Sequence, residues 1–218
     1  MTSTLPAILE NAPDALREEF QRHAISQNVQ TGAELSSEGA SCHFFPIVET
    51  GIVRVFKLSR EGGELTLYRI RTGEGCILTM TCLLHGSNFP ANAFVEQEGQ
   101  LWLIPSAVFK DWMVRFAFWR EYVIGFMSRT IGTLIGLVDD MVFRRVESRI
   151  IDALLRNTRH DEPLFRITHQ QIAYDIGTAR EVVSRHLKEF ETRGYISLSR
   201  GAIVILNRPA LARMTELL

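Results

Sequence analysis

The sequence predicts an α+β protein with three parts: an N-terminal all-β domain, a long helix and a C-terminal winged helix-turn-helix. Glycine, proline or polar clusters interrupt residues 28–105 every six to twelve residues, and short β-branched or aromatic runs lie between them. After Pro105 these interruptions stop, and apolar residues recur at helical spacing. Near the C-terminus, two short helical patterns meet at Gly177 and a hairpin pattern follows. We place the domains at residues 1–109, 110–143 and 144–218.

The β domain is expected to be a sandwich or barrel. Residues 52–56 and 65–70 form two strand-like runs on either side of Gly62 and Gly63, as a hairpin requires. The composition, with 46% apolar and 22% charged residues, is that of an ordinary globular protein. No segment approaches the roughly 18 uninterrupted apolar residues of a membrane span, and the N-terminus lacks a signal-peptide pattern. We therefore expect a cytoplasmic protein without a membrane partner.

The segment from Ser106 to beyond Asp139 is predicted to be one long helix. Its apolar stripe packs either on its own domain or against the same helix of a second copy, and the sequence leaves both alternatives open. The residues proposed for a dimer seam are Trp119, Val123, Phe126, Leu134 and Leu137.

Two capping patterns define the helix-turn-helix. Thr168 with Gln171, and Thr178 with Glu181, each fit a capping box that starts a helix. Gly177 supplies the turn between the two helices. Residues 194–206 then read as a hairpin around Arg200 and Gly201, so the motif is winged.

The second helix presents side chains that suit DNA. With Val183, Leu187 and Phe190 facing inward, the outward residues at its N-terminus are Arg180, Glu181, Ser184 and Arg185. Arg bonds guanine through two donors, and Glu accepts from cytosine. The alternative is a solvated face with an intrahelical Glu181–Arg185 pair. The distribution of charge favours the DNA-binding interpretation. Residues 1–140 carry 11 basic and 16 acidic groups, whereas residues 141–218 carry 13 basic and 9 acidic groups, and twelve of those 13 basic groups are Arg.

These features together resemble the Crp–Fnr superfamily of bacterial transcription regulators over nearly the whole chain. The resemblance rests on residues 49–55, 63–64, 72–74, 167–173 and 180–185. It implies a β-roll of the cyclic-nucleotide-binding type, a homodimer joined through the long helix, and double-stranded DNA with an inverted repeat of TGA half-sites as the partner. RNA polymerase is a further candidate partner. The resemblance also implies that Glu181, Ser184 and Arg185 match the Fnr-like recognition pattern, and that Arg180 matches the Crp-like Arg-Glu pair. Thr168 and Gln170 complete the expected DNA-binding residues.

The sensor half departs from the family members that bind cyclic AMP. Ile77 and Leu78 stand where those relatives have Gly-Glu, and no Lys or Arg occurs between Arg71 and Lys110. A buried cyclic phosphate without a cation would be costly, so cyclic nucleotide binding is disfavoured. An Fnr-type iron–sulfur cluster needs four thiolates, mostly N-terminal, but the chain has three cysteines and none precedes Cys42. We expect no cofactor and no metal, with haem as an alternative through His23, His43 or His85.

The favoured signal is oxidation or persulfidation of Cys76 and Cys82, with His85 as the local group able to activate them. The resemblance supports this weakly, since a thiol-sensing subgroup carries cysteine in the same segment. The alternative is a purely structural role, in which both thiols are buried and pack as small hydrophobic groups. A direct disulfide needs a bend in the backbone, because six residues of helix rise ~9 Å.

No nucleophile, phosphate-loop or metalloenzyme motif occurs, so the chain is not expected to be an enzyme. The alternative from another functional class is a cyclic-nucleotide-binding module that acts through protein partners. The sequence leaves open the effector, the role of Cys42, the operator, and whether binding activates or represses.

Overall fold

The computed structural model describes residues 5–59, 63–156, 158 and 164–216, and the chain divides into two compact units. The first unit comprises Met1–Lys57 with Leu67–Leu134, and the second comprises Leu58–Thr66 with Ile135–Leu218. This division by packing falls inside the long helix, whereas the borders proposed from the sequence lie at its two ends. Each unit has a hydrophobic core of its own.

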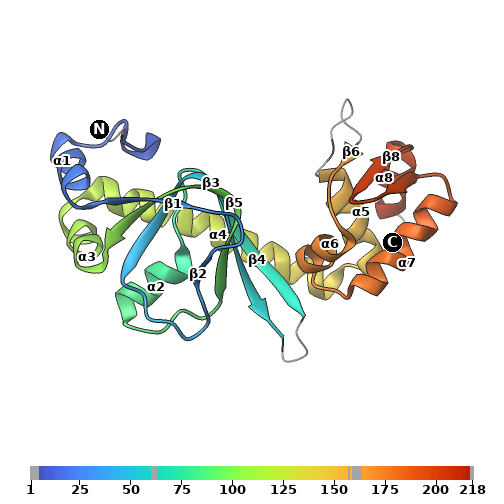
Figure 1. Ribbon diagram of the computed structural model, residues 1–218, viewed down its shortest axis with the longest axis horizontal. Coiled ribbons are helices and arrows are strands. Elements are labelled where there is room, and N and C mark those ends of the chain that lie inside the picture. The colour runs from blue at the N-terminus through green and yellow to red at the C-terminus, as the bar shows by residue number, and fades with distance from the viewer. Residues whose placement is uncertain (1–4, 60–62, 157, 159–163, 217–218) are drawn as a thin grey trace. The chain divides into compact units, whose positions relative to one another are not determined.

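An antiparallel β-sheet forms the body of the first unit (Figure 1). The strand order is β1-β5-β3-β4, and β2 also pairs with β5. The strands are β1 (Ile25–Val29), β2 (Glu34–Ser36), β3 (Phe44–Leu58), β4 (Glu64–Ile70) and β5 (Asn92–Pro105). Neighbouring β3 and β4 confirm the predicted hairpin, and Glu61 and Gly62 of its turn lie outside the described residues. In β4 Tyr68 and Ile70 are buried, as the period-two pattern of a strand requires.

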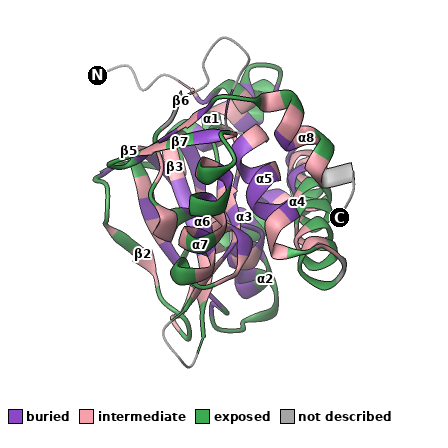
Figure 2. Ribbon diagram, turned by 90° about the vertical axis from the view of Figure 1, so that its right-hand side faces the viewer, coloured by how far each residue is buried: buried purple, intermediate pink, exposed green. Residues whose placement is uncertain are grey.

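Helices pack against the sheet and share an aromatic core with it. Figure 2 colours each residue by how far it is buried. The helical elements are η1 (Ala7–Leu9), α1 (Asp14–His23), α2 (Ile77–His85), α3 (Ser106–Arg115) and α4 (Ala117–Phe143). The largest fully buried rings are Phe20, Phe45, Phe89, Phe109, Trp112, Trp119 and Phe126. The rings of Phe45 and Phe109 stack with centroids 4.5 Å apart, and Trp112 meets Trp119 edge to face at 5.2 Å.

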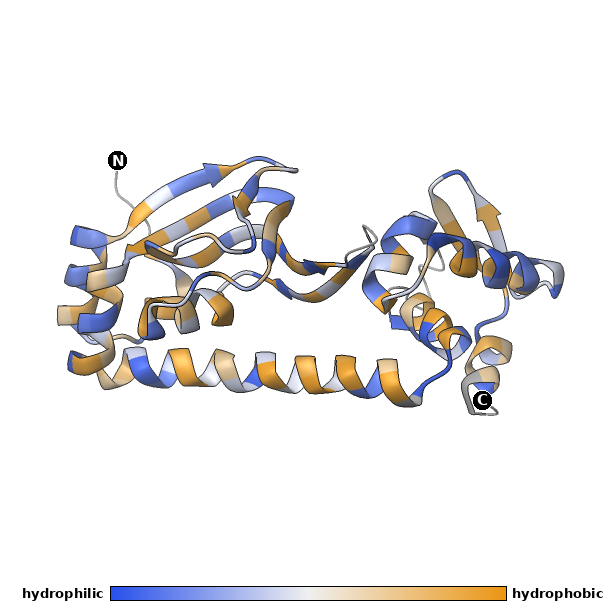
Figure 3. Ribbon diagram, turned by 90° about the horizontal axis from the view of Figure 1, so that it is seen from below, coloured by the Kyte–Doolittle hydropathy of each residue, from blue (hydrophilic) through white to orange (hydrophobic). Residues whose placement is uncertain are grey.

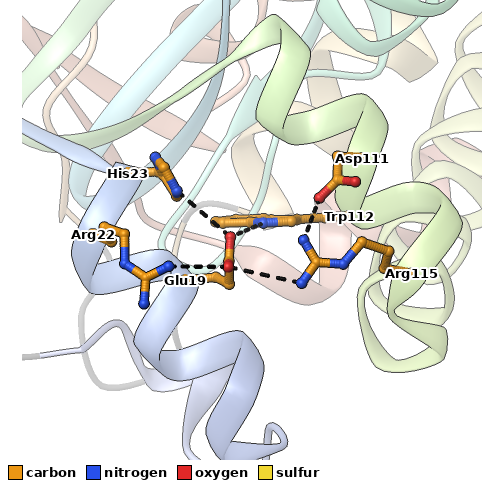
Figure 4. A network of polar contacts seen from close by, with 6 residues as sticks. All are labelled: Glu19, Arg22, His23, Asp111, Trp112 and Arg115. Atoms are coloured by element: carbon orange, nitrogen blue, oxygen red, sulfur yellow. Dashed lines mark hydrogen bonds and ion pairs between the residues drawn. The ribbon is translucent and has the colours of Figure 1, made fainter.

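A polar network joins α1 to α3 (Figure 4). The Glu19 carboxylate accepts a hydrogen bond from the buried Trp112 indole at 3.5 Å and lies 3.7 Å from the Arg115 guanidinium. Arg22 and His23, on the same helix as Glu19, lie 3.3 and 3.5 Å from that carboxylate. The indole N–H of Trp112 therefore has a partner although its ring lies in the core.

The single helix predicted from Ser106 is wrong, because the chain breaks at Phe116 into α3 and α4. Phe116 is extended, with φ −113° and ψ 112°. The Arg120 guanidinium donates to the carbonyls of Met113 and Val114 at 3.2 and 2.8 Å. Arg120 thus satisfies carbonyls that the end of α3 leaves without a helical partner. No glycine or proline marks this break in the sequence.

The 27-residue helix α4 carries hydrophobic side chains along its whole length, with hydrophilic ones between them (Figure 3). No helix within the described ranges has the length and apolar character needed to cross a membrane.

The second unit is a small α/β domain with the sheet order β6-β8-β7. Its elements are α5 (Val146–Arg156), β6 (Leu164–Phe165), α6 (His169–Ile176), α7 (Arg180–Thr192), β7 (Ile196–Ser199), β8 (Ala202–Ile205) and α8 (Arg208–Glu216). β7 and β8 pair antiparallel from Ile196↔Ile205 to Ser199↔Ala202, which confirms the predicted wing. Strand β6 and helix α8 were not expected from the sequence. Arg208 fixes α8 to α5 by donating to the Leu155 carbonyl at 2.6 Å.

Candidate nucleic-acid interface and sensor cavity

The helix-turn-helix is built from α6, Gly177 and α7. Thr168 caps α6: its side chain accepts from the Gln171 amide at 3.2 Å, and the Gln171 side chain accepts from the Thr168 amide at 2.9 Å. This is the predicted capping box. Gly177 ends α6 with φ +65°, a left-handed conformation that favours glycine. Behind the motif Val183, Leu187 and Phe190 have no exposed surface, so the opposite face of α7 is turned outward.

The second predicted capping box is wrong. Helix α7 begins at Arg180, its N-cap residue is Ala179, and no side chain caps it. Thr178 instead lies in the turn, where its amide donates to the Ala173 carbonyl at 3.0 Å. The first-turn amides of α7 therefore lack a capping side chain, and Glu181 lies in that positively polarised turn.

Exposed charges mark the start of α7. Arg180, Glu181 and Arg185 are exposed, and Ser184 is half-buried. Among the described residues, the ion pairs of α7 lie in its C-terminal half, where Lys188 meets Glu191 and Arg193 meets Glu189. The described structure thus contains no Glu181–Arg185 pair, and both head groups remain available to a ligand.

His169 connects the first helix to the recognition face. Its ring Nδ1 lies 2.9 Å from the Ser184 hydroxyl. Partial burial and the nearby Arg180 guanidinium lower the pKa of His169, so its ring is neutral at pH 7. A neutral ring can orient the Ser184 hydroxyl without adding charge. His169 was not among the residues proposed from the sequence. Of those that were, Thr168 is exposed and Gln170 is half-buried at the start of α6.

Thr168→Ala should weaken α6 locally. Loss of an N-cap side chain costs about 0.5 to 2 kcal/mol, so α6 amides should exchange with deuterium about 2- to 30-fold faster in native-state hydrogen exchange. Thr178→Ala is the matched control, because the Thr178 side chain caps no helix. Equal acceleration in both variants would show that the Thr168 cap does not stabilise α6.

A cavity of about 320 Å³ lies inside the β domain. Its wall is mostly apolar, including Val48, Val53, Ile70, Phe89 and Leu101, and it also contains Cys42, His43, Cys76 and Glu34. None of the described lining residues is Lys or Arg. A cyclic phosphate would therefore meet no Lys or Arg side chain there, and the lining does not fit a cyclic nucleotide.

The two proposed sensor cysteines lie at opposite ends of α2. Cys76 is the N-cap residue, and its sulfur lies 3.5 Å from the Thr79 amide and from the Tyr68 hydroxyl. Cys82 donates to the Ser87 carbonyl at 2.6 Å. Both are buried, and α2 is unbroken between them, so the bend that a Cys76–Cys82 disulfide needs is absent. His85 is exposed at the end of α2, outside the cavity lining.

Cys42 is the thiol that sequence reasoning left without a role. It is partly exposed and lines the cavity beside Cys76. Burial and the neighbouring thiols of Cys82 and Cys76 raise the pKa of Cys42 to about 12. Cys42 is therefore protonated and slow to react at neutral pH. Because Cys42 lies far from Cys76 in the chain, no sequence spacing signalled that both line one cavity.

Alkylation of native Cys42 by iodoacetamide should accelerate about tenfold per pH unit between roughly pH 7 and 10, because the thiolate fraction rises tenfold per unit well below the pKa. Tryptic peptide 23–54 contains only this cysteine, so mass spectrometry can follow its alkylation. Protein unfolded in urea is the control, and its rate should level off above about pH 8.5. A native rate that levels off at the same pH would show that the fold does not raise this pKa.

The three histidines considered for haem lie in different surroundings. His23 pairs with Glu19 on α1 (Figure 4), His85 is exposed, and only His43 lines the cavity. The described residues contain no cluster of three or more His, Cys, Asp or Glu side chains suited to a metal ion.

The predicted dimer seam needs correction. Trp119, Val123 and Phe126 are at most 1% exposed in the core of the first unit, so the prediction is wrong for these three. Leu134 packs partly against the same core, and Leu137 is half-buried. A different face of α4 is apolar and 42–64% exposed. We call it the α4 stripe, and it consists of Ile124, Ile131, Ile135, Val138 and Val142.

Comparison with known proteins defines the class. The family model of the cyclic nucleotide-binding domain matches residues 26–116, and that of the Crp-like helix-turn-helix domain matches residues 148–214. The fold and the two family-model matches together define a transcription regulator with a DNA-binding domain and a domain of the cyclic-nucleotide-binding type. The chain belongs to the Crp–Fnr superfamily and is a Crp/Fnr-type DNA-binding transcription regulator.

Individual relatives cover most of the chain. The cyclic AMP receptor protein of Thermus thermophilus is 26% identical over 187 residues, which is 85% of this chain and 84% of that protein. The anaerobic regulatory protein of Bacillus subtilis is 22% identical over 182 residues, 80% of this chain and 76% of that protein. A crystal structure of a Crp/Fnr-family protein from Eubacterium rectale aligns with a TM-score of 0.84 and 27% identity, covering 96% of this chain and 98% of that one.

Proposed function

We propose that the protein is a homodimeric regulator that reads an inverted-repeat DNA site and responds to modification of thiols in its β domain. The observation that carries the DNA part is the recognition face of α7. There Arg180, Glu181 and Arg185 are exposed and without ion pairs among the described residues, over a fully buried hydrophobic face. Arg185 is proposed to read guanine, and Glu181 the cytosine paired with it or a neighbouring one.

The α4 stripe supports the homodimer. Its residues follow the alternating spacing of three and four that coiled coils use, with exposed Ser128 filling the remaining position. Five exposed β-branched side chains in one row favour burial against another apolar surface. Crp/Fnr regulators typically bind DNA as dimers, so the second copy of this chain is the proposed occupant. Two recognition helices would then enter successive major grooves about 34 Å apart.

The cavity lining supports a signal other than a cyclic nucleotide. Its described residues include no Lys or Arg, but they include the two cysteines Cys42 and Cys76. Thiols are the lining groups that change covalently with redox conditions. The second candidate is a small uncharged ligand, because the size and apolar wall of the cavity suit one.

One selection experiment tests the DNA and signal parts together. The purified protein is used to enrich sequences from random duplex DNA, once with dithiothreitol and once after polysulfide treatment. We expect an inverted repeat with TGA half-sites, enriched to different extents in the two arms. Equal enrichment would contradict thiol control and favour the small ligand. Failure to enrich any sequence in either arm would contradict the proposed DNA-binding function and favour a module that acts through protein partners.

A further inference from the structure

Ser184 is the uncharged member of the recognition face of α7. It lies between Glu181 and Arg185 in the chain and is half-buried, whereas those two residues are exposed. A hydroxyl has one hydrogen to donate and lone pairs that accept, so it can bond to an acceptor or to a donor on a base edge. Which of the two Ser184 reads depends on where its own hydrogen is directed.

The hydroxyl hydrogen of Ser184 is directed at a ring nitrogen. A helical hydroxyl often donates to the carbonyl four residues earlier, as Thr192 of the same helix does to Lys188 at 2.9 Å. Among the described residues Ser184 makes no such bond, and its hydroxyl lies 2.9 Å from the Nδ1 atom of His169. We therefore treat the hydroxyl as the donor and Nδ1 as the acceptor of this bond.

The His169 ring is suited to that role. A neutral imidazole has one N–H and one bare nitrogen, and the hydrogen bond made by one nitrogen determines which of them carries the hydrogen. Partial burial and the nearby Arg180 guanidinium lower the pKa of His169, so the ring is neutral at pH 7. With Nδ1 accepting from Ser184, the ring hydrogen is on Nε2.

The two helices hold this pair together by themselves. His169 is the first residue of α6, and the Thr168 capping box fixes the backbone there. Val183, next to Ser184 in the chain, is fully buried in the core that α6 and α7 share, and this fixes the rotation of α7 about its axis. The hydroxyl is thus oriented before any DNA is bound.

We propose that His169 is a positioning residue for DNA recognition, because it holds the Ser184 hydrogen and so makes Ser184 accept a hydrogen bond from a base amino group. The amino groups in the major groove are adenine N6 and cytosine N4. Glu181 is proposed to take the cytosine of the TGA half-site, and both pairs that flank this G·C pair contain adenine. The expected target is therefore N6 of one of these two adenines. This inference rests on the proposed DNA reading and deepens it by naming the group that Ser184 recognises.

The same arrangement disfavours the opposite pattern. Guanine O6 and thymine O4 are acceptors, and they would face the lone pairs of Ser184 without a hydrogen between the two oxygen atoms. His169→Leu would release the hydroxyl hydrogen, and the hydroxyl could then turn and donate. This variant should therefore tolerate an acceptor that the wild-type protein rejects.

Modified bases test this one position at a time. The duplex is the inverted repeat enriched by the wild-type protein, and each adenine that flanks a G·C pair is replaced in turn. Purine opposite thymine removes the N6 amino group, whereas hypoxanthine opposite cytosine places an O6 acceptor there. Fluorescence anisotropy at one fixed salt concentration gives the affinities. Ser184→Ala lacks the hydroxyl and reports how each change affects the DNA itself, so every ratio is taken relative to this variant.

At one of the two adenine positions, purine should weaken wild-type binding about 2- to 12-fold per half-site, as loss of one hydrogen bond does. Hypoxanthine should weaken it further. His169→Leu should reverse this order, because its free hydroxyl can donate to O6. His169→Asn should restore the wild-type order, since the asparagine amide oxygen is attached to Cγ, as Nδ1 is in histidine, and can accept from Ser184.

His186→Leu is the matched control. His186 is also half-buried, but it lies on α7 with its ring centroid 6.4 Å from that of Phe190, and it should leave the wild-type order unchanged. All readouts compare duplexes bound by the same protein, so a general loss of stability or of DNA affinity cancels.

Three results would overturn the inference while leaving the proposed DNA reading intact. These are stronger wild-type binding to hypoxanthine than to purine DNA, the wild-type order in His169→Leu, and adenine positions at which wild type and Ser184→Ala respond alike. Each would be seen in a protein that still prefers the operator to random DNA. Equal wild-type binding to operator and random duplex would instead contradict the proposed base reading, and the role of His169 would fall with it.

Discussion

Ile135→Asp in the α4 stripe is expected to convert the dimer into monomers. Ile135 is 64% exposed in the isolated chain, and the proposed dimer buries it against its own symmetry mate. A carboxylate there would face a second carboxylate in an apolar seam without a cation. The penalty should be on the order of 3 kcal/mol or more, which raises the dimer dissociation constant at least about 100-fold. Sedimentation velocity over a concentration series measures this change.

Thr133→Asp is the matched control. Thr133 is exposed on the same helix, two residues from Ile135 and therefore about half a turn around the axis. It should leave the dimer intact. A dimer that survives Ile135→Asp, or one that Thr133→Asp disrupts equally, would show that the copies meet elsewhere. Trp119→Asp is no test of the interface, because that side chain belongs to the core of the first unit.

Arg185→Ala is expected to lower affinity for the selected operator by about 1 to 3 kcal/mol, or about 5- to 150-fold. The reason is loss of the two donors that bond guanine, so binding to random DNA should fall much less. Arg193→Ala is the control, because it removes the same charge from the other end of α7, where Arg193 pairs with Glu189. Electrophoretic mobility shift at one fixed salt concentration compares the three proteins on both DNAs.

The change of base preference adds a second readout. Without Arg185, discrimination at the guanine position should relax, whereas Arg193→Ala should leave it unchanged. Equal losses on operator and random DNA would identify Arg185 as a phosphate contact. That result would leave the helix-turn-helix as the DNA-binding element but remove its proposed base-reading residue.

Features set by a few neighbouring residues were predictable from the sequence. The Thr168 capping box, the turn at Gly177 and the β7–β8 wing each depend on contacts between residues no more than nine positions apart. The outward face of α7 was predictable too, because the spacing of Val183, Leu187 and Phe190 orients the whole helix. The order of the elements, together with the motifs at residues 167–173 and 180–185, therefore indicated the family.

The Thr178 error shows how narrow that local information is. Thr178 with Glu181 has the right residue types for a capping box, and so has Thr168 with Gln171. The chain placed Thr178 in the turn, where its amide follows the end of α6, and α7 started one residue later than the pattern predicted. The turn at Gly177 therefore kept Thr178 from capping α7, although its motif has residue types as suitable as those of the Thr168 motif.

Only the tertiary structure decided which surfaces are covered and which distant groups meet. Helix α4 is apolar on two faces, so its sequence alone could not tell the core side, with Trp119, from the exposed α4 stripe. At the break at Phe116, the Arg120 side chain of α4 reaches back and donates to carbonyls at the end of α3. Periodicity reflects the environment of neighbours along the chain, whereas packing joins residues far apart in it, as in the cavity lining that brings Cys42 and Cys76 together.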